Sequence, residues 1–379
     1  MTPKARPTKM NHPMFSDLIK SYPTSEALFA WLRSEEGGQL IVRENTTNPE
    51  KPLAVIYYDK KRSDMTKSHV QQFRSVVWDA LANRPVCVGP ARGFALAEAF
   101  NDGVNTFAVE DFVDGVMINM FHDGAAWRLA TRTQLDATGN FYGLRSFAEL
   151  FWETFRNSGL EFADLNPLHT YSWVLQHPAE RVVVAPQYGI PRLYMVEYSG
   201  PGALSAKVAA LQPKAHELKG LEDVKERVVA WGKRFGAAWQ GLVIKASNGK
   251  RYKSRSLQYN DARELRGNQA KLPYLWLERW SEGRLGAYLK QYPEEEHGAL
   301  ATVAAFKACT QEMHDLYQQV YRQKSLPLGQ APHKYRKLLW EVHQAGKGAY
   351  FKDLREFMNK QDTARKLFLI NYETRYGST

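Results

Sequence analysis

The apolar residues of this chain follow two different periodicities. Residues 15–33 carry them at helical spacing, which predicts one or two short helices. From about residue 40 to about residue 132 they come instead in short runs rich in β-branched and aromatic side chains, among them Leu53–Tyr58 and Phe73–Trp78. Such runs are typical of strands, so the pattern predicts a sheet-forming region after the first helices.

Two pairs of apolar runs are separated by turn sequences and predict β-hairpins. The runs 116–121 and 126–131 flank Asp123-Gly124, and the runs 240–245 and 250–256 flank Asn248-Gly249. Asp-Gly and Asn-Gly pairs readily adopt the positive φ angles that tight hairpin turns require. Further strands are expected at 170–175, 181–185 and 193–198, and helices at 144–155 and 224–235.

Beyond about residue 271 the strand signals fade and helical spacing takes over. Residues 294–322 place apolar side chains at steps of three and four, which is one face of a long helix. Further helices are expected at 334–345 and 351–368. The pattern therefore predicts an all-helical C-terminal domain.

This layout divides the chain into three predicted parts. Residues 1–13 contain three prolines and several basic residues and are expected to form a flexible basic arm. Residues 14–270 are expected to form an α+β domain, and residues 271–379 the all-helical domain. A chain of 379 residues is long for a single core, which agrees with two folded domains.

The charge of the chain points to a polyanionic partner. The net charge is +11 and the sequence pI is about 9.4, so the surface potential attracts phosphate groups. The ten Trp and 19 Tyr side chains could stack on bases. Aromatic residues also fill cores, and excess lysine also aids solubility, so composition alone leaves both interpretations open.

Several classes of protein are disfavoured by the sequence. The two cysteines, Cys87 and Cys309, support neither a disulfide framework nor a zinc site, and they suit a reducing compartment such as the cytoplasm. No apolar run approaches the length of a membrane-spanning helix, and the basic N-terminus is not followed by an apolar stretch, so neither a membrane span nor a secretory signal is expected. Signatures of zinc proteases, serine hydrolases and P-loop NTPases are absent from the sequence.

What remains is a series of strand-associated polar residues in a fixed order. The series runs through Arg74, Phe112-Val113-Asp114-Gly115, Arg132, Tyr171-Ser172, Gln240-Gly241 and Lys253-Ser254-Arg255-Ser256 followed by Tyr259. In this order and spacing it resembles the motif series of the covalent nucleotidyltransferase superfamily, and most closely that of RNA ligases of the T4 RNA ligase 1 type. The interval between Gln240 and Lys253 equals the family's spacing and is the most specific part of the match.

The resemblance implies a fold, a ligand and a set of contacts. The implied fold is α+β, a nucleotidyltransferase domain of ATP-grasp-like antiparallel sheets followed by a helical C-terminal domain. The residues that would contact the nucleotide or its phosphates are Arg74, Asp114, Gly115, Arg132, Lys253 and Arg255. RNA is the implied partner, ATP with magnesium is the family's cofactor pair, and a protein partner is also compatible. The likeness to phage enzymes implies a viral setting, in the host cytoplasm or on the virion, and a link to RNA repair.

Three departures from the family pattern fall on the residues that perform chemistry. The nucleophilic lysine is replaced by Phe112, which has no lone pair with which to attack a phosphorus atom. The family's two glutamates are replaced by Ser172 and Gln240, and a neutral amide is a poor magnesium ligand. We therefore expect no confident catalytic residue and no metal site, whereas the phosphate-holding cations are retained.

Three functional hypotheses follow. The first is a catalytically degenerate ligase-like protein that binds RNA in a basic cleft, with a nucleotide as a further candidate ligand. The second is an active enzyme, either an RNA ligase with its lysine elsewhere or one that seals RNA already adenylylated. The third is an unrelated basic nucleic-acid-binding protein, in which Arg74 is a surface residue, Asp114-Gly115 a plain turn and Lys253–Ser256 a solvated hairpin.

Overall fold

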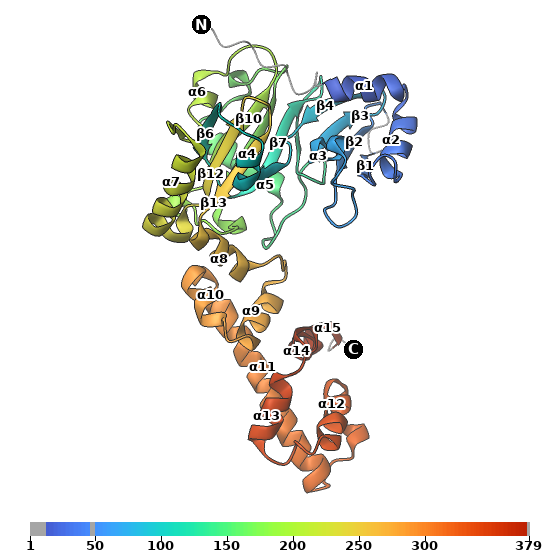
Figure 1. Cartoon of the computed structure of the whole chain (residues 1–379). Coiled ribbons are helices and arrows are strands. Elements are labelled where there is room, and N and C mark those ends of the chain that lie inside the picture. The colour runs from blue at the N-terminus through green and yellow to red at the C-terminus, as the bar shows by residue number, and fades with distance from the viewer. Residues whose placement is uncertain (1–12, 46–49, 377–379) are drawn as a thin grey trace. The chain divides into compact units, whose positions relative to one another are not determined.

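The computed structural model describes residues 13–45 and 50–376 (Figure 1). The predicted basic arm lies outside the described residues except for Pro13, which begins the first helix instead. The chain divides into two compact units, Met1–Asp261 and Ala262–Thr379. The first unit combines helices with largely antiparallel sheets and the second is helical, so the prediction of an α+β fold with a helical C-terminal region is confirmed.

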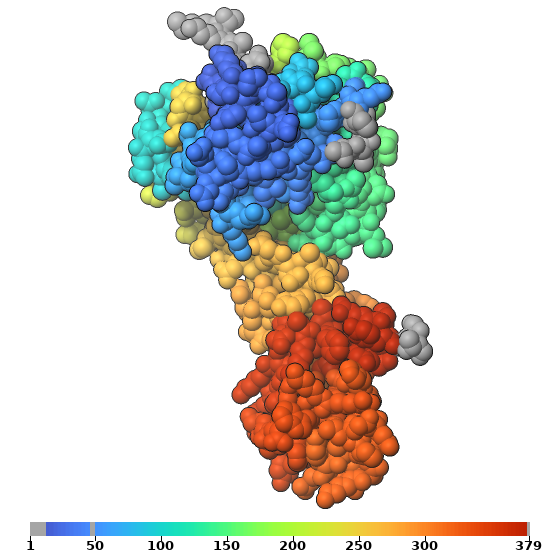
Figure 2. All heavy atoms as spheres, turned by 90° about the vertical axis from the view of Figure 1, so that its right-hand side faces the viewer, coloured from blue at the N-terminus to red at the C-terminus, as the bar shows by residue number. Residues whose placement is uncertain are grey.

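The first sheet packs beneath the N-terminal helices. Its antiparallel strands lie in the order β1 (Ile41–Asn45), β2 (Leu53–Tyr57), β3 (Val76–Asp79) and β4 (Arg84–Val88). Helices α1 (Pro13–Ser21) and α2 (Ser25–Arg33) cover one face and form the dark-blue surface in Figure 2. All five residues of β2 are buried because its second face packs against the next sheet, which explains why the run lacks a polar alternation.

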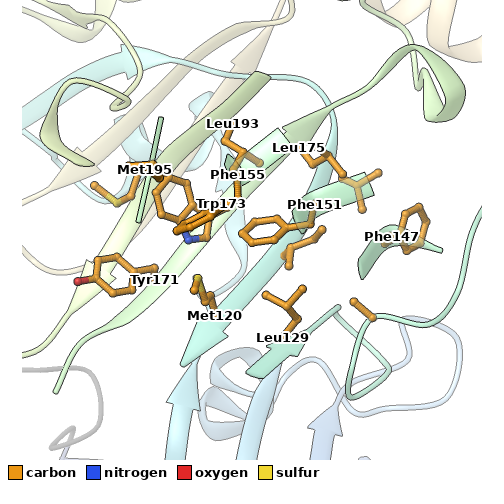
Figure 3. Packing of buried hydrophobic residues seen from close by; sticks show 14 of the residues in the cluster. Met120, Leu129, Phe147, Phe151, Phe155, Tyr171, Trp173, Leu175, Leu193 and Met195 are labelled. Atoms are coloured by element: carbon orange, nitrogen blue, oxygen red, sulfur yellow. The ribbon is translucent and has the colours of Figure 1, made fainter. Parts of the chain in front are cut away.

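The second sheet carries the largest aromatic core of the first unit. Its strands are β10 (Arg192–Ser199), β9 (Thr170–Gln176), β7 (Val116–His122) and β8 (Trp127–Ala130), all antiparallel. Alternate residues of these strands pack against helix α5 (Phe147–Asn157), as Trp173 and Phe151 illustrate in Figure 3. The alternation sends every second side chain, including Asn119 and Ser172, to the opposite face of the sheet.

The third sheet has one apolar and one polar face. Its strand order is β11 (Ala215–His216), β6 (Phe107–Asp111), β12 (Gly241–Ala246), β13 (Arg251–Arg255) and β5 (Gly93–Ala95), and only the β13–β5 pair is parallel. Helices α4 (Leu96–Asn101) and α7 (Leu221–Phe235) cover the apolar face, where Leu242, Ile244 and Tyr252 are buried. The residues between these positions in sequence point to the other face.

The remaining helices of the first unit are short. Helix α3 (Ser68–Gln72) precedes β3, and α6 (Ala206–Ala209) follows β10. Both predicted hairpins are present as β7–β8 and β12–β13, and Gly124 and Gly249 have φ angles of 93° and 81° in their turns. The turn predictions are therefore confirmed.

The second unit is built from helices around two apolar clusters. The chain enters it along α8 (Leu257–Arg266), followed by α9 (Leu272–Ser281), α10 (Leu285–Gln291), α11 (Glu296–Tyr317), α12 (His333–Gln344), α13 (Phe351–Asn359), α14 (Thr363–Ile370) and α15 (Tyr372–Tyr376). The predicted long helix continues past α11 as a π-helical turn, Gln318–Arg322. The predicted single helix at 351–368 is wrong, because Asp362 caps a new helix by accepting a hydrogen bond from the Arg365 N–H.

Two strand predictions in the first unit are also wrong. Residues 73–75 form a turn after α3, so Arg74 lies in a loop and β3 begins only at Val76. Residues 181–185 form no strand, because the N–H groups of Val183 and Val184 bind a carboxylate instead of a neighbouring strand. No helix of the described residues is long and apolar enough to cross a bilayer.

Candidate functional site

The polar face of the third sheet concentrates positive charge. Strand β13 alternates, so Arg251, Lys253 and Arg255 share one face while Tyr252 points into the core and is fully buried. Lys253 is paired with Val243 of β12 on one side and with Ala95 of β5 on the other. Because the neighbours of Lys253 on its own strand face are two arginines, any group that balances its charge has to come from another part of the chain or from a ligand.

Lys253 is surrounded by further cations. Burial lowers the pKa of its amine to about 8, and the neighbouring charges that add to the shift are Arg255, Arg74, Lys60 and Arg92. Lys253 makes no hydrogen bond or ion pair within residues 13–45 and 50–376. Four cations from four segments of the chain therefore act on one half-buried amine without a carboxylate among them.

Arg74 belongs to the same cluster. Burial lowers the pKa of its guanidinium, and the nearby charges of Arg251, Arg132 and Arg255 lower it further, against an opposing effect of Tyr58. Arg74, like Lys253, forms no hydrogen bond or ion pair with any residue that the structure describes. Cations that are partly buried in this way and have no protein partner point to an anionic ligand.

Arg132 completes the group from the end of the β7–β8 hairpin. Its Nη2 donates to the carbonyl oxygen of Tyr58 at 2.7 Å, and its guanidinium lies 4.8 Å from the centre of the Tyr58 ring. Its Nε is buried and has no hydrogen-bond partner in the described chain. We call Arg74, Arg132, Lys253 and Arg255 the cationic cluster; their role as phosphate-binding residues stays a prediction.

Phe112 lies beside this cluster. Its N–H donates to the carbonyl oxygen of Gly241, which holds the start of the Phe112–Gly115 loop against β12. The guanidinium of Arg255 lies 4.8 Å from the centre of the Phe112 ring. A cation–π contact of this kind orients the arginine without neutralising its charge.

Asp114 and Gly115 have clear structural roles. The buried Asp114 carboxylate accepts hydrogen bonds from the N–H groups of Val183 and Val184 at 2.9 and 2.8 Å and from the Tyr259 hydroxyl at 2.6 Å. Gly115 has a φ of 144°, and a Cβ there would overlap the carbonyl oxygen of Leu175. The pair therefore ties together a loop, a distant segment and helix α8, and its predicted contact with a nucleotide remains untested.

Ser172 takes part in a buried chain of hydrogen bonds. Its hydroxyl donates to Oδ1 of Asn119 at 2.8 Å, and Nδ2 of Asn119 donates to the Ser75 hydroxyl at 2.8 Å. The Ser75 hydroxyl in turn donates to the carbonyl oxygen of Thr131 at 3.2 Å. This chain connects the second sheet to the segment after Arg74 and leaves no anionic group at position 172.

Gln240 is buried, and its Oε1 has no hydrogen-bond partner among the described residues. Two carboxylates close to β12 and β13 are already ion-paired: Glu110 of β6 with Lys245 at 2.6 Å, and Glu197 of β10 with Arg251 at 2.7 Å. The described chain holds no group of three or more His, Cys, Asp or Glu side chains that could bind a metal ion. The donor set beside the cationic cluster therefore does not suit magnesium, which prefers carboxylate oxygens.

Some members of this site were missed in the sequence. Arg251 could have been recognised, because strand alternation places it on the same face as Lys253. Tyr58 and Lys60 come from the loop after β2 and Arg92 from the loop before β5, and only the fold shows their proximity to the cluster. A pocket of about 430 Å³ lies elsewhere, between the start of α7 and the segment before it, and it includes none of the cationic cluster.

The comparisons with known proteins give partial likenesses. No protein-family model and no curated protein matches the sequence. An archaeal ATP-dependent RNA ligase is similar over 76% of this chain and 73% of its own, with a TM-score of 0.42 and 13% identity. A putative ATP-dependent DNA ligase from Aquifex aeolicus is similar over 93% of this chain and 80% of its own, with a TM-score of 0.39 and 13% identity.

An RNA ligase variant from Naegleria gruberi, with AMP and manganese, is similar over 46% of this chain, with a TM-score of 0.33 and 12% identity. The match spans 57% of the Naegleria chain, which is less than two thirds of its length. Similarity at these TM-scores and identities decides neither the fold family nor the activity of this chain.

Proposed function

We propose that this protein is a ligase-like, catalytically degenerate nucleotidyltransferase that binds RNA through a phosphate group held by the cationic cluster. The observation that carries the proposal is the pair Arg74 and Lys253. Both are partly buried, both lack a protein partner within the described residues, and they lie within electrostatic reach of each other. Forked arginine donors and a lysine point charge are the groups that proteins use for phosphates.

Self-adenylylation is not part of the proposed function. The step needs an unprotonated amine that attacks the α-phosphate of ATP while pyrophosphate leaves. Position 112 carries a phenyl ring stacked on Arg255, and positions 172 and 240 carry a neutral serine and glutamine. Losing the nucleophile removes the covalent route, and losing the carboxylates removes the metal's support.

The expected ligand is RNA rather than an isolated nucleotide. The net charge of +11 extends beyond the four cluster residues and favours a polyanion. Both predicted hairpins are present, and Arg132 from one and Lys253 from the other each lie within electrostatic reach of Arg74, which counts against the alternative of an unrelated basic protein. ATP remains a weaker candidate ligand, since its phosphates offer the same chemistry to the cluster.

Binding of a labelled single-stranded RNA with a 5′-phosphate tests the proposal. We expect Lys253→Ala and Arg74→Ala each to weaken binding by about tenfold, the magnitude of a charge-assisted phosphate contact. The matched control is Lys233→Ala, which removes one positive charge from an exposed position of α7 in the same unit. Equal loss in all three variants would mean that net charge, and not the cluster, binds RNA.

A second candidate activity is the sealing of RNA that another enzyme has already adenylylated. Such an end carries a pyrophosphate linkage, whose charges the cationic cluster could hold, and the step needs no lysine nucleophile. Incubation with 5′-adenylylated RNA and an acceptor strand distinguishes the two functions. A joined product would establish ligation, and its absence despite binding would support the non-catalytic function.

A further inference from the structure

The balance of charges around the cationic cluster bears on how a phosphate is held there. Besides burial, the strongest effects on the Lys253 amine all come from cations. Magnesium sites in proteins combine carboxylate oxygens with phosphate oxygens, so that the metal's charge is partly balanced by the protein. A second positive ion placed among these side chains would face repulsion from each of them.

Three carboxylates near the cationic cluster are already engaged. Asp114 accepts three hydrogen bonds from protein donors, Glu110 is paired with Lys245, and Glu197 with Arg251. Moving one of them onto a metal would leave a half-buried lysine or arginine, or buried backbone N–H groups, without a partner. Each such loss carries a desolvation penalty.

The two positions at which the resemblance places glutamates offer no substitute. The Ser172 hydroxyl donates its hydrogen bond to Asn119, and Gln240 provides a neutral amide. An amide oxygen is a hydrogen-bond acceptor, so Gln240 suits a hydroxyl or amino group of the ligand better than a metal ion. Relative to the resemblance, neutral side chains stand where carboxylate metal ligands are expected, while the cations are kept.

We propose that the cationic cluster binds the terminal phosphate of RNA directly, with no divalent cation between protein and ligand, and that a protonated Lys253 supplies part of the charge a metal would otherwise provide. This inference rests on the proposed function and specifies how the site works. It departs from the ATP and metal requirement that the resemblance implies.

Proton linkage gives the proposal a second, independent readout. The Lys253 amine has a pKa of about 8 in the free protein, so it is largely protonated at pH 7 and largely neutral at pH 9. A phosphate favours the protonated form, so binding should weaken as the pH rises through about 8. The charged groups that face Lys253 are Arg255 on its own strand and Arg74, Arg92 and Lys60 from loops. The three arginines keep their charge throughout this range.

The test uses the full chain and a short single-stranded RNA with a 5′-phosphate, with the 5′-hydroxyl form as control. Fluorescence polarisation is measured in excess EDTA and in magnesium chloride at equal ionic strength. We expect affinities that agree within about twofold, with the 5′-phosphate form preferred in both buffers. Magnesium that tightens binding by about tenfold, with loss in EDTA, would overturn the inference and leave RNA binding intact.

The remaining outcomes separate the two proposals. Absence of binding in both buffers would contradict the proposed function itself.

In EDTA, raising the pH from 7 to 9 should weaken binding by up to about tenfold. The variant Lys253→Arg, whose charge does not titrate in this range, should show a flatter pH profile of binding. A wild-type profile as flat as that of Lys253→Arg would remove Lys253 from the site. Circular dichroism of the variant shows that a changed profile does not arise from unfolding.

Discussion

Phe112 combines a chemical absence with a structural contact. Its ring has no lone pair with which to bond to phosphorus, and it lies 4.8 Å from the Arg255 guanidinium, which the contact helps to orient. Ser172 also has a structural role. Its hydroxyl belongs to a buried hydrogen-bond chain through Asn119 and Ser75. At the residue scale, positions 112 and 172 therefore carry side chains suited to packing and hydrogen bonding.

The Ser172 chain leads to a prediction about stability. Replacing Ser172 by Ala leaves Oδ1 of the fully buried Asn119 without its donor, so we expect the free energy of unfolding to fall by about 1–3 kcal/mol. Urea denaturation measures the change. The control is Ser247→Ala in the exposed turn between β12 and β13, which should alter stability by less than about 0.5 kcal/mol. Equal effects would show that the chain does not stabilise the fold.

At the scale of elements, the loop before β7 is the point where separate segments meet. The Asp114 carboxylate binds residues 183–184 and the Tyr259 hydroxyl of α8, and Gly115 passes close to β9. This arrangement fixes the loop that carries Phe112 and, through the Phe112–Gly241 hydrogen bond, fixes it against β12. The cationic cluster is thereby supported by a rigid neighbour rather than by a free turn.

A matched pair of glycine variants tests this support. Gly115→Ala combines an unfavourable φ with overlap against Leu175, so we expect a loss of at least about 3 kcal/mol or failure to fold. Gly124→Ala also has a positive φ, but no atom lies closer to its Cβ than the end of the Lys51 side chain at 3.9 Å. It should cost only about 1–2 kcal/mol by thermal or urea unfolding. Similar losses would contradict the close approach at Gly115.

The extent to which the sequence predicts this fold differs between local and long-range features. The hairpins around Gly124 and Gly249 were predictable, because turn residues and alternation are local signals. The break at Asp362 was missed although the cap lies in the sequence, because apolar spacing continues across it. Residues 181–185 read as a strand because their composition is β-rich, while their true partner is Asp114, far away in the chain.

The candidate site shows the same division. The basic strand with Lys253 and Arg255 is visible in the sequence, as is the absence of a lysine at position 112. The proximity of Arg74 and Arg132 to that strand was expected only through the resemblance, and their lack of carboxylate partners depends on the whole fold. Sequence alone does not reveal which charges are paired, because pairing is decided by segments far apart in the chain.

At the scale of the whole molecule, the chain joins a mixed α/β unit that carries the cationic cluster to a helical unit, with a surplus of positive charge overall. Under the proposed function, such a protein binds RNA ends without consuming ATP, and so could protect an end or hold it for another enzyme. Binding, which the cationic cluster supports in this proposal, is therefore separate from covalent charging, for which position 112 offers no amine.

Intact mass spectrometry after incubation with ATP and magnesium tests this separation most directly. The account predicts that the mass of the purified protein stays unchanged, while the same preparation binds 5′-phosphorylated RNA. A covalent AMP adduct on Lys253, or on any other side chain next to the cationic cluster, would contradict it.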